Sequence, residues 1–388
     1  MTAPNQPQNQ HQVQRGSIFV YRVYDVAEEI NLFKVEKILS NEPDRVRLSL
    51  TRTPRQSLVM RNPPIRFRLG EADLNLGAEK VRAEIYATLF DYGVLSIVFQ
   101  ISILKDTPWD RLLQFSEALI GDAKGNLEMD ELDQLARRKA GEITNMIYHA
   151  LKAPAERTLF EDYVIFFLEE VDGIVHGKDL LTQTDLSALI LGESKEKLAD
   201  KCKASILENT YQYAENDLVV IDWNSAVVFE PSGQRGIPDV LEFALTHLLE
   251  FRYYDDVLDH RLSELYDRVE SQRARGFGRI FGMIWKEDFA AISQDANARF
   301  IEFSELIDRI DNSLKVVGDF YLAVIFRGGL RRFRISDWQQ NVTRKMNTLA
   351  RVAELLQGEI NVRRGHMLEF VVIALIAFEI ISAILRKL

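Results

Sequence analysis

The sequence predicts an α+β protein: an N-terminal mixed α/β body, a stalk of long antiparallel coiled-coil helices, and one C-terminal transmembrane helix. Short β-rich runs alternate with helical segments over residues 16–235. Apolar residues then recur at spacings of three and four, which keeps them on one side of long helices. The chain finally reads MLEFVVIALIAFEIISAIL over residues 367–385. A helix of that length spans roughly 28 Å, close to the thickness of a bilayer core.

Composition places the chain among globular proteins and narrows its partners. It has 388 residues, of which 47% are hydrophobic and 27% charged, and its net charge is −10. The negative charge argues against a general nucleic-acid binder. The single cysteine, Cys202, excludes an internal disulfide and a zinc site built from several cysteines. Residues 1–15 are polar and rich in Pro and Gln, so we expect a disordered leader there.

The body, residues 16–235, alternates strands and helices, with an expected division into two subdomains near 108–155. Two pairs of β-rich runs flank short loops that contain Asp with Gly or Asn, which is typical of β-hairpins. We expect hairpins over 81–103 and 218–229, further strands over 17–24, 45–51, 65–69 and 160–168, and helices over 109–120, 129–151, 182–191 and 195–209.

Beyond Pro238 the strand pattern ends and helical spacing takes over. Three apolar rows predict long helices over 238–273, 288–327 and 336–386, with breaks near Gly276–Gly278 and at Gly328–Gly329. The expected domains are a helical hairpin over 236–335 whose two helices are antiparallel, a basic juxtamembrane helix over 336–366, and the transmembrane helix over 367–385. The rows fit packing within one chain and packing between subunits equally well.

Basic residues crowd the approach to the terminal helix. Residues 327–364 contain nine Lys or Arg against three acids, in a chain whose net charge is −10. Lys and Arg beside a membrane helix favour the cytoplasmic side and attract anionic lipid. The residues expected to contact lipid headgroups are Arg331, Arg332, Arg334, Arg344, Lys345, Arg363 and Arg364.

Two membrane-embedded acids are predicted in the terminal apolar run, Glu369 near its start and Glu379 deeper inside. An isolated charged carboxylate within a bilayer costs about 3 kcal/mol. We expect Glu379 to stay protonated, to reach outward to the headgroups, or to pair with another copy of the same helix. Proton or ion transport ranks behind these readings, because one spanning helix lines no path unless it oligomerises.

No catalytic motif stands out, so we expect a protein that is not an enzyme and needs no cofactor. The six histidines show no metal-binding spacing, and the sequence holds no phosphate-binding loop or nucleophile elbow. Asp255 and Asp259 lie one helical turn apart, but solvated helix charge explains them better than a metal site does. We therefore predict no catalytic, cofactor-binding or metal-binding residues.

Four stretches of the chain resemble one known family. They are Leu89-Phe90-Asp91-Tyr92-Gly93, Leu258-Asp259-His260-Arg261-Leu262, Leu368-Glu369-Phe370 and Ala377-Phe378-Glu379. In these features the chain is similar to the "required for meiotic nuclear division" family, which includes yeast sporulation factors, a mitochondrial inner-membrane protein that supports translation, and many bacterial proteins. The likeness implies a non-enzymatic, oligomeric, membrane-anchored scaffold and supplies no catalytic residues. The stretch 108–235 is longer than the family norm.

These patterns together predict a single-pass membrane protein with its bulk in the cytoplasm, at the bacterial inner membrane or, in a eukaryote, the mitochondrial inner membrane. The leading hypothesis is a homo-oligomeric scaffold whose body meets a protein partner, while anionic lipid holds its tail. The alternative is a subunit of a CorA-like ion transport assembly, which has a similar layout but needs two membrane helices and a Gly-Met-Asn loop. We expect no nucleic-acid partner.

Overall fold

The structure is a computed structural model that describes residues 11–40, 46–47, 62–77, 79–120, 131–155, 159–193, 196–274, 301, 303–305, 319–352, 369, 372–373, 375–376, 378 and 382. The chain divides into two units. The first comprises Met1–Tyr253 and Ile310–Ser336, and the second comprises Tyr254–Arg309 and Asp337–Leu388.

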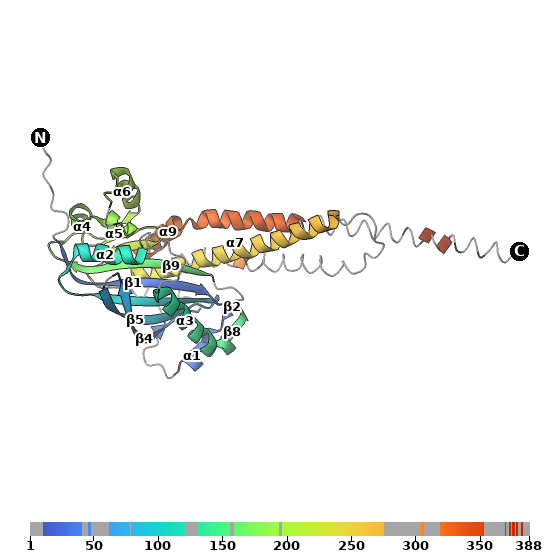
Figure 1. The fold of residues 1–388 in the computed structure, drawn as a ribbon, viewed down its shortest axis with the longest axis horizontal. Helices are drawn as coiled ribbons and strands as arrows, with labels where there is room; N and C mark the ends of the chain where they lie inside the picture. Colours follow the sequence, from blue (N-terminus) through green and yellow to red (C-terminus); the bar gives the residue numbers. More distant parts are fainter. Residues whose placement is uncertain are drawn as a thin grey trace. The chain divides into compact units, whose positions relative to one another are not determined.

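A ten-stranded sheet forms the centre of the first unit (Figure 1). Its strands follow the order β10-β11-β12-β9-β1-β6-β5-β4-β3, and β7 pairs with the start of β1. Strand β12 runs parallel to β9, and the other pairs are antiparallel. The strands are β1 Gln12–Asp25, β3 Val46–Arg47, β4 Ile65–Leu76, β5 Glu79–Leu89, β6 Val94–Ile103, β7 Thr107–Pro108, β9 Phe160–Val171, β10 Thr210–Tyr211, β11 Leu218–Ile221 and β12 Ser225–Phe229.

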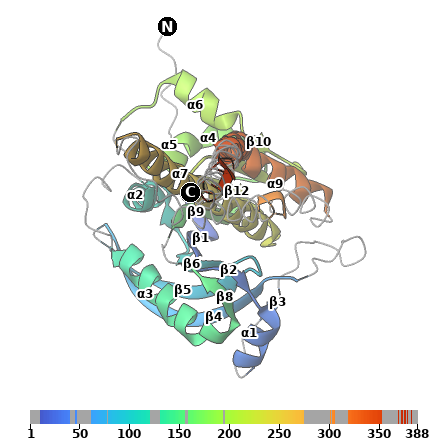
Figure 2. The same cartoon turned by 90° about the vertical axis from the view of Figure 1, so that its right-hand side faces the viewer.

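Helices and a small second sheet complete the described fold. Figure 2 shows β9, β1, β6, β5 and β4 one below another in that order, with helices around them. The small sheet pairs β2 Ala27–Ile30 with β8 Leu151–Pro154. The helices are α1 Leu32–Ile38, α2 Trp109–Ile120, α3 Glu131–Met146, the 3-10 turn η2 Tyr148–Ala150, α4 Gly177–Gln183, α5 Leu186–Leu191, α6 Asp200–Leu207, α7 Gly236–Ala274 and α9 Phe320–Arg332.

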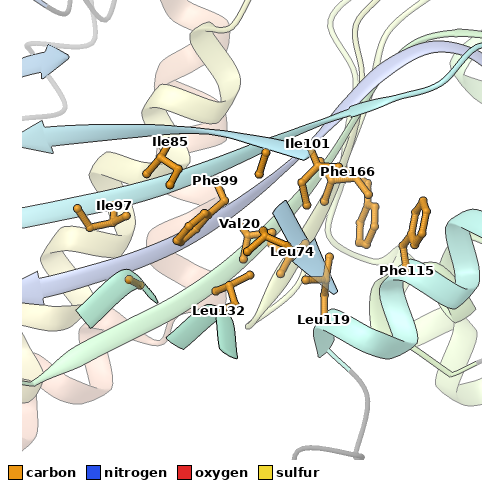
Figure 3. Close-up of a cluster of buried hydrophobic side chains, with 14 of the residues drawn as sticks. Val20, Leu74, Ile85, Ile97, Phe99, Ile101, Phe115, Leu119, Leu132 and Phe166 are labelled. Carbon is orange, nitrogen blue, oxygen red and sulfur yellow. The ribbon is translucent and has the colours of Figure 1, made fainter. Parts of the chain in front are cut away.

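Alternate side chains of a strand point to opposite faces of the sheet. The main core lies on one of these two faces. Inward residues of β1, β5, β6 and β9 pack with apolar residues of α2, α3 and α5 into one cluster. Figure 3 shows part of it, with Phe99 and Phe166 from strands facing Leu119 and Leu132 from helices. Burying each large apolar side chain contributes about 2 kcal/mol, so this face supplies most of the stabilisation of the sheet.

The opposite face of the sheet is covered by α7 and α9 and mixes apolar with polar residues. Its β1 side chains include Phe19 and Tyr21, which are 5% and 2% exposed. Thr88 of β5 and Ser96 of β6 are each 0% exposed. Buried hydroxyl groups cost free energy unless they find hydrogen-bond partners. We call this side of the sheet its polar face, and the candidate site described below lies on it.

The prediction of an α+β body is confirmed in its main elements. The hairpin predicted over 81–103 is the β5–β6 pair, and the hairpin over 218–229 is the β11–β12 pair. The strand predicted over 160–168 is β9, and the helix over 109–120 is α2. The single helix predicted over 182–191 is wrong, because Thr184 in extended conformation and the Asp185 N-cap separate α4 from α5.

The helices predicted after the body need two corrections. The continuous helix over 288–327 is interrupted at Asp319, whose extended backbone and side-chain bonds to two backbone N–H groups begin α9. The break expected at Gly328–Gly329 lies instead at Phe333 and Arg334. Both glycines are helical and lie within α9. They allow a neighbour to approach closely, because a Cβ on Gly328 would lie 2.6 Å from the Tyr211 ring. Of the antiparallel hairpin predicted over 236–335, residues 275–300, 302 and 306–318, which include most of its second helix, lie outside the described residues.

The predicted fold class is wrong in its last element, the transmembrane helix. Within the part of the chain that the structure describes, no helix combines the length and the apolar character needed to cross a bilayer. The longest, α7, has 39 residues but carries charges along its length. Of the predicted span 367–385, only Glu369, Ser382 and five apolar residues are described, and Glu379 lies outside.

Candidate functional site

A cluster of buried charges joins the polar face of the sheet to the start of α7. Arg66 of β4 donates from Nε to Thr88 Oγ1 at 3.1 Å and from Nη1 to Asp239 Oδ1 at 2.7 Å. Its Nη2 donates to the carboxylate of Glu242. Asp239 and Glu242 are three residues apart, which places both on one side of α7. One guanidinium thus binds two acids of the first helical turns.

Burial makes this cluster electrostatically strong. Glu242 is 1% exposed, and burial raises the pKa of its carboxyl group although Arg66 opposes the rise. Burial alone would lower the pKa of Arg66, but Asp239 and Glu242 raise it. Burial, and then the charge of Glu242, raise the pKa of the Tyr21 hydroxyl well above its ordinary value. The bonds from Arg66 to Asp239 and Glu242 fasten α7 to the sheet.

The polar contacts continue from this cluster toward the beginning of β1. Arg235, just before α7, donates to Gln100 Oε1 at 3.1 Å, and its guanidinium lies 5.4 Å from the centre of the Phe19 ring. Gln100 Nε2 donates to Ser17 Oγ at 3.4 Å. The seam between sheet and helix therefore combines hydrogen bonds with a cation–π contact.

The turn between β5 and β6 packs against the first third of α7. Tyr92 OH lies 2.7 Å from Thr246 Oγ1, and the Phe90 ring stacks on Phe243 at 6.3 Å between centroids. Gly93 has φ +92, and a Cβ there would lie 1.6 Å from Ala27 O. Only glycine fits this position. The stretch Leu89–Gly93, one of the four used for the family resemblance, thus makes an aromatic contact with α7.

A second buried ion pair fastens the end of α9 to the sheet. Arg332 Nε donates to Asp222 Oδ1 at 2.6 Å, and the Asp222 side chain is 1% exposed. Tyr163 OH donates to the carbonyls of Asp222 and Ser225 at 2.9 and 2.8 Å. The Tyr163 ring also meets Phe333 edge-on at 5.4 Å. The β11–β12 turn and the end of α9 are therefore held together by charge, hydrogen bonds and ring packing.

In the second unit, the two acids considered for a metal site bind a lysine instead. Lys345 Nζ lies 2.7 Å from Asp255 Oδ1 and 2.6 Å from Asp259 Oδ1. Burial alone would lower the pKa of Lys345, but the two carboxylates raise it. The Tyr254 ring meets Phe303 at 5.7 Å. Among the described residues, no group of three or more His, Cys, Asp or Glu is arranged to hold a metal ion.

The residues predicted to contact lipid have different surroundings. Arg331 and Arg334 are exposed, whereas Arg332 and Lys345 are occupied by the carboxylates just described. Arg344 is exposed and donates to Asn341 Oδ1 at 2.5 Å. Glu369 is exposed. Arg363, Arg364 and Glu379 lie outside the described residues.

Sequence reasoning missed the cluster around Arg66. The alternation of Ile65, Phe67 and Leu69 with arginines resembles a strand with one side in water. The available signal was the pair Asp239 and Glu242, which lies beside the apolar row of the predicted helix over 238–273. Acids next to such a row indicate a partner of opposite charge on the surface that the helix covers.

Comparison with known proteins gives a family for the body. A family model described as "Uncharacterized protein MJ0711, N-terminal domain" matches residues 15–235, more than half of the chain. The Methanocaldococcus jannaschii protein "Uncharacterized protein MJ0711" is 22% identical over 231 residues, which cover 58% of this chain. They cover 66% of the relative, just under two thirds of its length. No solved structure matches the chain. The chain belongs to the family of the MJ0711 N-terminal domain.

Proposed function

We propose that this chain is a non-enzymatic scaffold that associates with the cytoplasmic face of a membrane and assembles with copies of itself. The exposure of apolar side chains near the C-terminus carries the proposal. The helical residues concerned are each 52–71% exposed: Val372, Ile373, Leu375, Ile376 and Phe378. Successive helical residues point about 100° apart, so these five side chains spread over more than half of the helix circumference. Exposed apolar side chains spread in this way favour an apolar environment.

Lipid is the environment that fits the charges nearby. Arg344 and Arg351 are exposed on the helix over 335–352, which precedes the apolar residues. Basic residues beside an apolar segment attract the anionic cytoplasmic leaflet. The proposal is association with the bilayer and does not include a helix that crosses it. In this reading the polar seam around Arg66 keeps the body rigid so that it presents a fixed surface to a protein partner.

Self-association draws support from the second unit. Its helices bury Leu258, Val342 and Met346, which are 0–4% exposed. They also leave Tyr266 and Ile301 58% and 59% exposed. Exposed aromatic and aliphatic side chains on helices are typical of surfaces that pack against another subunit. We therefore propose that copies contact one another through these helices.

Flotation with lipid vesicles tests the membrane half of the proposal. We expect the full chain to float with the vesicles and the Ile373→Glu/Ile376→Glu variant to stay behind, because two buried apolar side chains contribute about 4 kcal/mol together. The matched control is Phe33→Glu, since Phe33 is 69% exposed on α1. A wild-type chain that stays behind, or a control that fails as the variant does, would contradict the proposal.

Light scattering tests the assembly. A mass of two or more chains in detergent supports it, and a single chain at micromolar concentration contradicts it. The CorA-like alternative predicts ion flux across vesicle membranes that contain the protein. Flux that Glu379→Gln abolishes would replace the scaffold with a transport subunit.

A further inference from the structure

Helix α9 has a buried side and an exposed basic side. Arg327 and Arg331 are exposed, whereas Phe326 before them and Gly328 and Gly329 between them are buried. Residues four apart share one side of a helix, so Arg327 and Arg331 lie on the same side of α9. Arg334 is exposed in the turn that ends the helix. Residues 320–334 hold four arginines and no acid, in a chain whose net charge is −10. The exposed side of α9 is therefore a local concentration of positive charge.

One arginine of α9 does not contribute to this exposed basic side. Arg332 turns inward to the buried carboxylate of Asp222, so its charge is compensated within the protein. The exposed arginines are Arg327, Arg331 and Arg334. Arg334 adopts φ +56, in the left-handed region that favours glycine. An arginine where glycine would fit with less strain has a cost of about 1 kcal/mol, which suits a side chain with a function.

An exposed aromatic residue begins α9, and another belongs to the turn bonded to the last residue of α9. Phe320, at the first position of α9, is 76% exposed. Trp223 is 63% exposed and follows Asp222, the partner of Arg332 at the last position of the helix. The Tyr163 hydroxyl holds this turn by its bonds to the carbonyls of Asp222 and Ser225. The ion pair between Asp222 and Arg332 thus brings the turn that contains Trp223 to the end of α9, across 110 residues of sequence.

We propose that the exposed arginines of α9, together with Trp223, form a binding surface for the phosphate groups of anionic lipid headgroups. The surface rests on the proposed membrane function and assigns it a second contact, on the body, besides the apolar residues 372–378. Guanidinium groups bind phosphate through paired N–H donors. Indole rings favour the boundary between headgroups and lipid tails, where one edge stays wet. Single-stranded nucleic acid is the competing polyanion, and the net charge of −10 disfavours it.

Vesicle binding of the full chain separates this surface from the apolar tail. The vesicles contain phosphatidylcholine alone, or phosphatidylcholine mixed about three to one with phosphatidylglycerol. We expect Arg327→Gln/Arg331→Gln to bind the anionic vesicles about 25-fold more weakly, at about fivefold for each arginine, and to bind the neutral vesicles as the wild type does. The matched control is Arg137→Gln/Arg138→Gln, which removes two exposed arginines from α3.

Arg334→Gly separates binding from folding. It relieves the left-handed strain, so we expect an unchanged or higher melting temperature together with about fivefold weaker binding to anionic vesicles. Brominated lipid in the anionic vesicles should quench tryptophan fluorescence less in Trp223→Phe than in the wild type. Together these results support a headgroup surface.

Several outcomes overturn the inference. If the wild type and Arg327→Gln/Arg331→Gln bind anionic vesicles equally, the headgroup surface on α9 is overturned and the proposed membrane function is left intact. If the α3 control loses as much binding to anionic vesicles as the α9 variant, the loss follows from the change in net charge and the inference is overturned. A wild type that binds neither vesicle overturns the membrane function as well. If the α9 variants instead lose binding to single-stranded polyuridine while vesicle binding is unchanged, the surface belongs to nucleic acid.

Discussion

Replacing Arg332 by methionine should destabilise the body by about 3 kcal/mol. The Asp222 side chain is 1% exposed and takes two donors from the Arg332 guanidinium. Removing one member of a buried ion pair costs about 3–5 kcal/mol, because the other charge stays buried without a partner. The low end applies since the Arg332 side chain is 29% exposed. Urea unfolding at pH 7, followed by circular dichroism, measures the free energy of unfolding.

Two further variants test the physical reason for that loss. Arg331→Met changes the neighbouring exposed arginine and should alter stability by less than about 0.5 kcal/mol. Asp222→Asn, added to Arg332→Met, removes the isolated charge and should recover most of the loss. An Arg332→Met cost below about 1 kcal/mol, or a double variant no more stable than the single one, would refute the reasoning.

Three other changes probe separate parts of the structure. Gly93→Ala should cost more than about 3 kcal/mol, seen as a lost or sharply lower melting temperature, because its Cβ would meet Ala27 O at 1.6 Å. Burial raises the pKa of Asp25 from 3.8 to about 7, so the folded state keeps a proton that the unfolded state releases. The free energy of unfolding should therefore fall between about pH 4 and 7 by up to about 4 kcal/mol, and Asp25→Asn should remove that fall in a urea titration. Lys345→Met should lower the free energy of unfolding by about 1 kcal/mol in thermal unfolding, since it leaves the carboxylates of Asp255 and Asp259 close together without the lysine between them.

The hairpins of the body could be predicted because their information is local. Asp91 and Gly93 lie between two β-rich runs, and the turn that follows Asp222 has the same character. The order of the sheet could not be predicted. β1 pairs with β6 on one side and with β9 on the other, over separations of about 80 and 150 residues. Such pairings depend on which apolar faces meet, which no short window of sequence contains.

The candidate site could not be found from sequence because its two halves look ordinary when separate. Arg66 alternates with apolar residues, as a residue on a wet strand face does, and Glu242 resembles a solvated helix acid. They meet only because α7, 173–176 residues after Arg66, covers the face of the sheet that the alternation assigns to water. A polar strand face therefore indicates a wet surface or a charged partner, and the partner must come from the fold.

The terminal apolar run shows a similar limit. Its composition indicates contact with an apolar environment, and the exposure of Ile373 and Phe378 agrees with that reading. Length and hydropathy do not determine whether such a run crosses a bilayer, lies along it or packs on another chain. The error in the predicted fold class came from treating one of these outcomes as implied by the composition.

The two faces of the sheet explain why the polar seam is present at all. An apolar face packs well against helices in several registers, since dispersion and burial are not directional. Ion pairs and hydrogen bonds are directional. Arg66 can therefore donate to Asp239 and Glu242 together only when α7 lies in one position on the sheet. The hydrogen bond between Tyr92 and Thr246, about one turn beyond Glu242, fixes the rotation of the same helix. Buried polar groups add little net stability, and their value here is a single position for α7 on the sheet. The scaffold function proposed above would depend on that fixed geometry, because a protein partner would bind a surface that must not shift.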